Sequence, residues 1–340
     1  MVKVAIIETS HWHVPLYIDG LMAADIDVVA ISDATRSSSS DALASRLGAR
    51  TYDRVSDLLK HEQIDFAFAF GRHCDLPQVA KSLIQAGVPF SVEKPCGMCS
   101  DDVAEILNAA EAANLYVAVP YIYRVSDLCH AVEDLEGGLP SDFTHLSIRF
   151  IAGPPERYET WNCGWMLDPE TSGGGALMNV GGHFLDLFRL LTGKPVTRVS
   201  AVMSSATHGA AVEDFAVVTL QAENVIGIVE VGYTFPGVAP GSAGHQREFS
   251  FTARSSAHYL RSCDGGIAVS KIDGNGGSIR TIGFEPETDL YYPLFVKQVL
   301  DEWRQGLAPS VGLREALEAM KILEAAYASA RLGGTPISLD

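Results

Sequence analysis

The chain has 340 residues, of which 47% are hydrophobic and 20% are charged, and its formal net charge is −17. This is the composition of a globular protein long enough for two domains, and its acidity argues against nucleic acid or an anionic membrane as a main partner. No apolar run approaches the length of a membrane span, and six cysteines in so long a chain do not make a disulfide framework. The opening MVKVAIIETSHW predicts a strand and no signal peptide. We therefore expect a cytoplasmic protein.

The first 120 residues alternate short apolar runs with amphipathic segments. The apolar runs are VKVAII, IDVVAIS, IDFAFAF, PFSVEK and LYVAVP, and helical patterns separate them. This alternation predicts an α/β domain with a parallel, doubly wound sheet. We expect a Rossmann-type dinucleotide-binding domain over residues 1–121.

The pattern changes after Tyr121. A helix is expected near 126–136, then several strand-like runs follow one another without helices, and helices near 289–305 and 312–331 end the chain. Residues 122–340 are therefore predicted to form an α+β domain for substrate binding and oligomerisation, with an open-faced, mostly antiparallel sheet. A Gly/Pro-rich loop is expected at 236–246. Because NVIGIVEVGYTF is apolar on both alternations, we expect a homo-oligomer, a dimer or a tetramer, built through the open face.

Two stretches carry the chemistry. Glu93, Lys94 and Pro95 close the apolar run PFSVEKP, where a buried parallel strand would emerge at the ligand-binding edge of its sheet. The second stretch, 173–193, is predicted to be a helix on which Asn179, His183 and Asp186 fall at i, i+4 and i+7 on one face. A lysine opposite an imidazole, an amide and a carboxylate is a proton-transfer constellation, so these residues are the predicted catalytic set.

The first strand–helix connection differs from a glycine-rich dinucleotide fingerprint. Where Gly-x-Gly-x-x-Gly is expected, residues 8–13 read Glu-Thr-Ser-His-Trp-His. Glu8 would repel a pyrophosphate, whereas Thr9 and neighbouring polar groups could compensate by hydrogen bonding. Asp33 closes the second strand at the position that holds the ribose hydroxyls, which favours NAD, and Arg36 leaves NADP open. The alternative is a Rossmann-like domain that no longer binds the coenzyme well.

Over nearly its whole length, the sequence resembles the Gfo/Idh/MocA family, which includes glucose–fructose oxidoreductase and inositol dehydrogenase. The resemblance rests on the VAII…VVAISD opening, IQAGVPFSVEKP, VPYIYR, WMLDPETSGGGALMNVGGHFLDLFRLLTG and ILEAAYASARLG. It implies an NAD(P)-binding domain, a substrate domain with an open-faced sheet, sugar or polyol oxidoreduction, and catalytic roles for Lys94 and His183. The sequence departs from the family in lacking the glycine fingerprint, in Asn179 where an aspartate is common, and in Arg72 where a proline is common.

The remaining candidates form two sets. The predicted coenzyme-binding residues are Thr9, Ser10, His11, Trp12, His13, Asp33, Arg36, Gly71, Arg72, Glu93 and Lys94. The predicted substrate-binding residues are Asp186 together with Tyr121, Tyr123, Arg124, Trp161 and Trp165. For the last five, core or interface packing is an equal alternative. Cys96 and Cys99 form a Cys-x-x-Cys without a second pair, so packing is favoured over redox or metal use, and no metal is predicted.

The sequence thus predicts an NAD(P)-dependent dehydrogenase that moves a hydride between nicotinamide and a sugar, a polyol such as inositol, or a related hydroxy compound. His183 would accept the hydroxyl proton, Lys94 would steady the developing alkoxide, and Asp186 would bind substrate hydroxyls or orient His183. The alternative is a non-catalytic relative that senses a sugar or a nucleotide. The missing glycines favour this alternative, whereas the retention of Lys94 and His183 argues against it.

Overall fold

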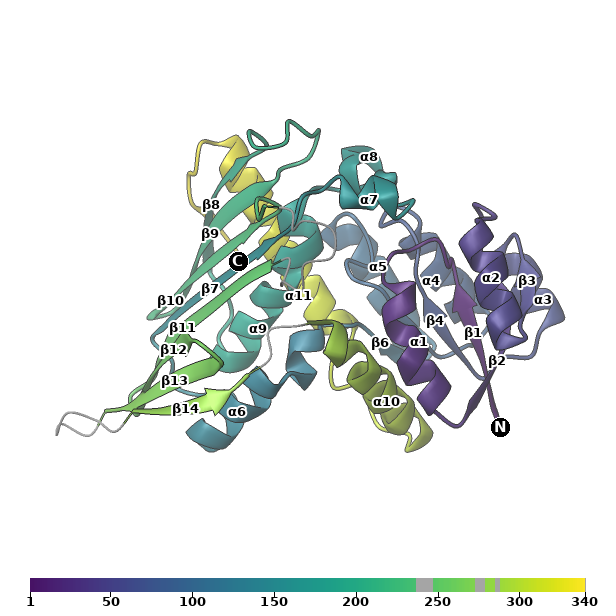
Figure 1. The fold of residues 1–340 in the computed structure, drawn as a ribbon, viewed down its shortest axis with the longest axis horizontal. Coiled ribbons are helices and arrows are strands. Elements are labelled where there is room, and N and C mark those ends of the chain that lie inside the picture. The colour runs from purple at the N-terminus through teal and green to yellow at the C-terminus, as the bar shows by residue number, and fades with distance from the viewer. Residues whose placement is uncertain (237–246, 273–278, 285–287, 340) are drawn as a thin grey trace. The chain divides into compact units, whose positions relative to one another are not determined.

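The structure is a computed structural model that describes residues 1–236, 247–272, 279–284 and 288–339 (Figure 1). The chain forms two compact units. Unit 1 comprises residues 1–120, 158–173 and 289–318, and unit 2 comprises residues 121–157, 174–288 and 319–340. Two segments from the second half of the chain therefore belong to unit 1. The division into domains 1–121 and 122–340 stays a prediction, and the predicted loop at 236–246 lies outside the described residues except for its first residue.

Unit 1 is built on a six-stranded sheet with the order β3-β2-β1-β4-β5-β6. Every strand pair in it is parallel. All four residues of β4 are buried, as expected for a strand covered on both faces. The predicted doubly wound sheet is confirmed. Its strands are β1 (Val2–Ile7), β2 (Ile26–Ser32), β3 (Arg50–Tyr52), β4 (Phe66–Ala69), β5 (Phe90–Val92) and β6 (Val117–Ala118).

Helices connect these strands and cover the sheet. In unit 1 they are α1 (Val14–Ala23), α2 (Ser38–Leu47), α3 (Val55–His61), α4 (Leu76–Gln85), α5 (Ser100–Ala112), the short α8 (Pro169–Ser172) and α10 (Tyr291–Arg304). Helices α1 and α10 lie side by side (Figure 1). A Cβ at Gly20 of α1 would come within 2.8 Å of the Pro293 Cα, so glycine permits this close approach.

Unit 2 contains a nine-stranded sheet with the order β14-β13-β12-β11-β7-β10-β9-β8-β15. Its strands pair antiparallel except for β7 with β10, which confirms the predicted mostly antiparallel sheet. They are β7 (His145–Ala152), β8 (Arg198–Ser204), β9 (Phe215–Ala222), β10 (Val225–Gly232), β11 (Arg247–Arg254), β12 (His258–Cys263), β13 (Gly266–Lys271), β14 (Ile279–Gly283) and β15 (Ile337–Ser338).

One face of this sheet is covered by helices. The described helices of unit 2 include α6 (Asp127–Glu136), α9 (Gly182–Thr192) and the second part of α11 (Leu313–Arg331). Helix α9 packs closely on β10, because a Cβ at Gly227 would lie 2.6 Å from the Phe188 Cε2. On the opposite alternation of β10, the side chain of Ile226 remains 52% exposed.

The helix predicted over 173–193 is interrupted. It consists of a π-helical turn, Leu177–Gly181, followed by α9. A π turn holds more residues than an α turn, so it changes which residues share a helical face, and such turns are frequent at functional sites. The predicted single stripe through Asn179, His183 and Asp186 assumed an unbroken α-helix, and that assumption is wrong.

Within the described ranges, no helix combines the length and the apolarity that crossing a membrane would require.

Candidate active site

The predicted coenzyme residues of unit 1 follow the carboxyl ends of four neighbouring strands. Residues 8–13 follow β1, Asp33 follows β2, Gly71 and Arg72 come shortly after β4, and Glu93 and Lys94 follow β5. Because these strands are parallel and adjacent, the residues meet at one edge of the sheet. In open α/β sheets that edge binds the ligand.

Glu8 takes the place of the first fingerprint glycine and also adopts a glycine-like backbone. Its φ is 58°, in the left-handed region that side chains rarely adopt. Its carboxylate accepts hydrogen bonds from the Ala34 N–H at 3.1 Å and the Ser32 hydroxyl at 3.3 Å. The tight turn after β1 is therefore kept without glycine, and these bonds hold the carboxylate at the end of β2. Gly71 allows the close approach of this turn, since a Cβ there would lie 3.3 Å from the Glu8 Cβ.

The rest of the loop is fastened to its own unit. Thr9 bonds through its backbone N–H to the Ser32 carbonyl and through its hydroxyl to Ser40. The Ser10 carbonyl accepts from the Cys163 thiol at 3.4 Å. Ring contacts hold the next two residues: Trp12 stacks on Trp161, and His11 lies against Trp165. The predicted substrate residues Trp161 and Trp165 thus lie beside the predicted coenzyme loop.

A buried polar network surrounds Glu93. Tyr17 on α1 donates to Glu93 Oε1 at 2.7 Å, and the Lys94 backbone N–H donates to Oε2 at 3.0 Å. His13 Nδ1 lies 3.1 Å from Oε1, within ion-pair range but not aligned as a hydrogen bond. The other ring nitrogen of His13 is 3.0 Å from the Tyr292 hydroxyl of α10. Burial is the main cause that lowers the pKa of His13 well below its usual value, so this histidine is neutral.

Lys94 is buried after β5, at this edge of the sheet. Burial lowers the pKa of its ammonium group from 10.5 to about 8, and the negative charge of Glu93 opposes that shift. A lysine with such a pKa can hold or release a proton near neutral pH, which an exposed lysine cannot. This environment suits a proton-transfer or alkoxide-stabilising group.

Sequence reasoning missed His73. This residue is buried after β4, and its Nδ1 lies 2.7 Å from the Ser172 carbonyl of α8. Burial lowers its pKa to about 4, against the opposing effect of that hydrogen bond, and Lys94 and Glu93 are among the charges that act on it. Its position directly after Arg72, at the end of a buried strand, was the available signal. Arg72 itself pairs with Asp75 at 2.6 Å.

In unit 2, His183 lies at the start of α9 and makes edge-to-face contacts with two aromatic rings. The ring centroids of Tyr121 and Tyr123 are 5.9 Å and 6.1 Å from the ring of His183. Asn179, in the π turn, donates from Nδ2 to the Tyr233 hydroxyl at 3.0 Å. The predicted substrate tyrosines and the predicted base therefore form one buried cluster.

Asp186 has a strong partner in Arg124. The guanidinium donates from Nε to Oδ2 at 2.7 Å and from Nη2 to Oδ1 at 2.6 Å, which is a bidentate pair. The carboxylate is buried and the guanidinium is mostly so. Two predicted substrate residues thus bind each other, and a buried pair of this kind fixes the face of α9 that carries His183.

The glycine run before the π turn is explained by Glu213, a residue that sequence reasoning missed. Its carboxylate accepts from the Gly175 N–H at 2.8 Å, the Leu177 N–H at 2.9 Å and the Tyr327 hydroxyl at 2.8 Å. A Cβ at Gly175 would lie 2.0 Å from the Glu213 carbonyl oxygen, so only glycine fits there. Burial raises the pKa of Glu213 despite these hydrogen bonds.

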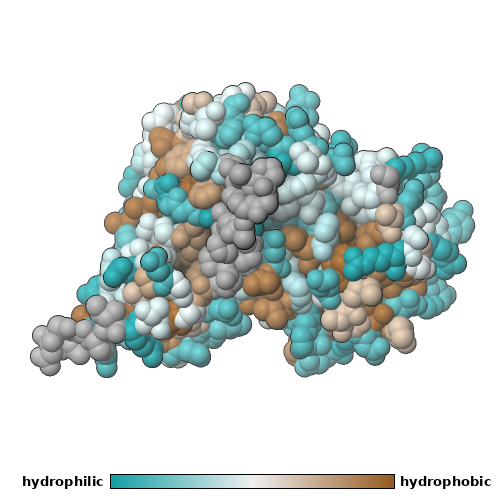
Figure 2. Space-filling model, in the orientation of Figure 1, coloured by the Kyte–Doolittle hydropathy of each residue, from teal (hydrophilic) through white to brown (hydrophobic). Residues whose placement is uncertain are grey.

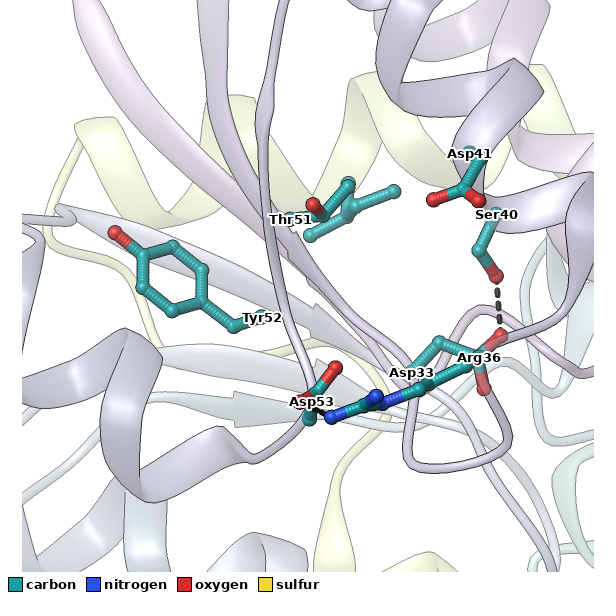
Figure 3. Close-up of a pocket in the computed structure, with 8 residues that line it drawn as sticks. Asp33, Arg36, Ser40, Asp41, Thr51, Tyr52 and Asp53 are labelled. Atoms are coloured by element: carbon teal, nitrogen blue, oxygen red, sulfur yellow. Dashed lines mark hydrogen bonds and ion pairs between the residues drawn. The ribbon is translucent and has the colours of Figure 1, made fainter.

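At the end of β2, Asp33 lines a pocket of about 130 Å³ (Figure 3). Burial raises the pKa of this carboxyl, but hydrogen bonds from Ser37, Ser40 and Thr35 outweigh burial and lower it to about 2. Asp33 is therefore ionised at every physiological pH. Its position, together with the start of α1 directly after residues 8–13, fits the ribose and the pyrophosphate of a dinucleotide.

The cysteine pair shows no reactive character. Cys96 and Cys99 form no disulfide, and burial raises the pKa of Cys96 to about 12. A thiol with a raised pKa is a poor nucleophile and a poor metal ligand. Within the residues that the structure describes, no group of three or more His, Cys, Asp or Glu side chains is arranged to hold a metal ion.

Comparison with known proteins agrees with the fold. Residues 4–121 match a family model described as an oxidoreductase family with an NAD-binding Rossmann fold, and residues 135–251 match the GFO/IDH/MocA C-terminal domain. The chain is 26% identical over 227 residues to the rhizopine catabolism protein MocA of Rhizobium meliloti, which covers 64% of this chain and 67% of that protein.

Two further relatives extend over the whole chain. D-xylose 1-dehydrogenase (NADP(+)) 2 of Haloferax volcanii is 24% identical over 334 residues, or 95% of each protein. The structure of a levoglucosan dehydrogenase in complex with NADH and levoglucosan superimposes with a TM-score of 0.83 at 15% identity, covering 99% of each chain. At this identity, the structural likeness speaks for the fold alone.

Proposed function

Because the chain belongs to the GFO/IDH/MocA family of NAD-binding oxidoreductases, we propose that it transfers a hydride between a nicotinamide coenzyme and a CH–OH group of a sugar, a polyol such as inositol, or a related hydroxy compound. The observation that carries the proposal is Lys94, buried at the carboxyl edge of the parallel sheet with a pKa of about 8. Nothing in a purely structural role requires a buried ammonium group at that edge.

Coenzyme binding is assigned to the loops after the parallel strands. Thr9, Ser10 and His11 would line the pyrophosphate with Trp12 and His13 behind them, and Asp33 and Arg36 would flank the ribose. Gly71, Arg72, Glu93 and Lys94 would complete the edge. When bound, the coenzyme supplies the hydride acceptor; the protein supplies orientation and proton handling.

His183 is the proposed base for the substrate hydroxyl proton, and Lys94 the proposed donor that stabilises the alkoxide. Tyr121 and Tyr123 support this assignment because their rings contact the imidazole edge to face. Asn179 is the proposed orienting residue, since an amide cannot take up a proton. Asp186 and Arg124 would act together as a pair, and the exposed ring of Trp161 offers an apolar face for a sugar ring.

The alternative is a non-catalytic sensor of a sugar or nucleotide. It is favoured by Glu8, which replaces a fingerprint glycine and adds a carboxylate, held at the end of β2, to the expected coenzyme loop. The names of the relatives favour the enzyme, because xylose and levoglucosan dehydrogenases act on sugars and the latter was studied with NADH.

One experiment separates the two functions. NADH binding is measured by fluorescence titration. The protein is then assayed with NAD+ and a panel of aldoses, anhydrosugars and inositols, and the NADH formed is followed by its absorbance. We expect NADH binding and turnover of at least one polyhydroxy compound. Binding of a sugar without turnover, together with no effect of Lys94→Ala on that binding, would support the sensor.

We further propose a homo-oligomer assembled through the open face of the unit 2 sheet. Figure 2 shows hydrophobic residues interspersed with hydrophilic ones on the part of unit 2 that carries β8 to β10. Ile226 and Val202 are exposed there. The expected cytoplasmic location also stays a prediction.

A further inference from the structure

The pocket at the ends of β2 and β3 is lined by more acidic than basic side chains. It is lined by Ile31, Asp33, Arg36, Ser40, Asp41, Thr51, Tyr52 and Asp53, all from unit 1. Three carboxylates and one guanidinium therefore line it (Figure 3). In a Rossmann domain this is the end of the site that distinguishes a free ribose 2′-hydroxyl from a 2′-phosphate.

Asp33 makes many contacts within its own loop. Its Oδ1 accepts from the Thr35 N–H at 3.0 Å and the Thr35 hydroxyl at 2.7 Å. Its Oδ2 accepts from the Ser37 N–H at 2.9 Å, from the Ser37 hydroxyl at 2.6 Å and from the Ser40 hydroxyl. Both oxygens are thus already hydrogen-bonded by the protein. Asp33 therefore contributes a fixed negative charge to the pocket. The cationic side chain that lines the pocket has its ion-pair partner on another element.

Arg36 is that cation, and it is directed at Asp53. Its guanidinium forms an ion pair with the Asp53 carboxylate, which follows β3 (Figure 3). The backbone of Arg36 has a φ of 51°, in the left-handed region, which fixes where its side chain leaves the turn. Both side chains are largely exposed, so the pair is weak and exchangeable. A phosphate that approaches this guanidinium must displace the Asp53 carboxylate and also meets its negative charge.

We propose that Asp53 is a specificity-determining residue for the coenzyme: by pairing with Arg36 it withholds the pocket's cation from a 2′-phosphate and so favours NAD over NADP. Without Asp53, the guanidinium is free to pair with the phosphate and one repelling charge is lost. The preference for NAD over NADP is then set by Asp53, which follows β3, as well as by Asp33. This inference rests on the proposed function, since it assumes that the pocket receives the coenzyme ribose.

The test compares NADH and NADPH affinities by fluorescence titration in the wild-type chain and in Asp53→Asn. We expect the variant to bind NADPH about tenfold more tightly than the wild type does, because a charge-assisted hydrogen bond is gained and a repulsion removed. NADH affinity should change by less than about threefold. The gain should shrink as salt is added, since the groups are exposed.

Asp41→Asn is the matched control. Asp41 lines the same pocket from α2, whereas the ion pair of Arg36 is made with Asp53. Both variants remove one negative charge, so only the release of Arg36 differs between them. A second control adds Arg36→Ala to Asp53→Asn, which should abolish the gain in NADPH affinity. Arg36→Ala alone should lower the affinities for NADPH and NADH to a similar extent, because Asp53 already pairs with the guanidinium and keeps it from a 2′-phosphate.

Two results would overturn the inference. Equal gains in NADPH affinity in Asp53→Asn and Asp41→Asn would show that the effect comes from the loss of one negative charge and not from the release of Arg36. A loss of affinity in Arg36→Ala alone that is much larger for NADPH than for NADH would mean that Arg36 already binds the 2′-phosphate in the wild type. Either result leaves the oxidoreductase function intact as long as the wild-type chain binds NADH. A wild-type chain that binds neither dinucleotide would contradict both the coenzyme role of this pocket and the proposed function.

Discussion

At the scale of single residues, burial and one neighbouring carboxylate determine how Lys94 titrates. Burial lowers its pKa from 10.5 to about 8, and Glu93 keeps it from falling further. Because the proposed role of Lys94 requires its charged form, turnover should fall as pH rises through about 8. Glu93→Gln removes the favourable charge, so the same decline should begin at lower pH. The measurement is kcat/KM as a function of pH on an identified substrate, because this ratio reports the groups that titrate in the free enzyme.

Tyr17→Phe is the control for this prediction. It removes one hydrogen bond to Glu93 but keeps the carboxylate, so the midpoint should move less than in Glu93→Gln. Lys94→Arg keeps a cation that does not titrate, and the decline near pH 8 should disappear even if the rate is lower. An unchanged decline in Lys94→Arg would assign it to another group.

His183 is the proposed proton acceptor, and its removal should be costly. His183→Ala should lower turnover by about two to four powers of ten, the usual contribution of a general base. NADH affinity should stay nearly the same, because His183 belongs to unit 2 and the coenzyme loops to unit 1. His130→Ala, the same change on an exposed histidine of α6, should leave turnover unchanged.

The neighbouring amide provides a second comparison. If Asn179 only orients the imidazole, Asn179→Asp should retain or raise activity.

Near-full turnover in His183→Ala would contradict the role of His183 as proton acceptor. Lys94, Tyr121 and Tyr123 would then be the next candidates.

At the scale of an element, the glycine-led turn before α9 depends on Glu213. This buried carboxylate satisfies two backbone N–H groups that would otherwise lack partners at the start of a helical segment. We expect Glu213→Ala to lower the free energy of unfolding by about 2 to 4 kcal/mol, since buried donors are left unsatisfied and a charge-assisted bond is lost. Urea unfolding followed by circular dichroism measures this change.

Two variants separate the carboxylate from its surroundings. Tyr327→Phe removes a single hydrogen bond and should cost about 1 kcal/mol. Glu223→Ala, an exposed glutamate at the start of the turn after β9, should cost less than about 0.5 kcal/mol. A cost for Glu213→Ala no greater than that for Glu223→Ala would show that the turn is held by packing alone.

At the scale of the whole molecule, the unit 2 sheet leaves one alternation of β10 uncovered. Light scattering at micromolar concentration should therefore find a dimer or a tetramer. Ile226→Lys places a charge on the exposed alternation and should shift the protein toward monomer. Leu307→Lys is the matched control, since Leu307 is exposed to a similar degree but belongs to unit 1. A wild-type monomer at that concentration would contradict the proposed assembly.

The sequence determined the architecture because its signals are local. Strands buried on both faces appear as continuous apolar runs, and the polar residues that end them must meet at one edge of a parallel sheet. The order of elements, the parallel sheet and the placement of Asp33, Glu93 and Lys94 after buried strands therefore follow from the sequence. The same holds for the α+β character of the second half.

Only the tertiary structure decided the partners of these residues. Arg124 and Asp186 are 62 residues apart, and Tyr292 and His13 are 279 apart. Glu213 accepts from backbone N–H groups 36 and 38 residues before it. Helical and strand periodicities report which residues of one element share a face, not which distant chain segment packs there. These periodicities also do not predict the π turn before α9 or the Arg36–Asp53 pair, because each depends on how separate segments pack together.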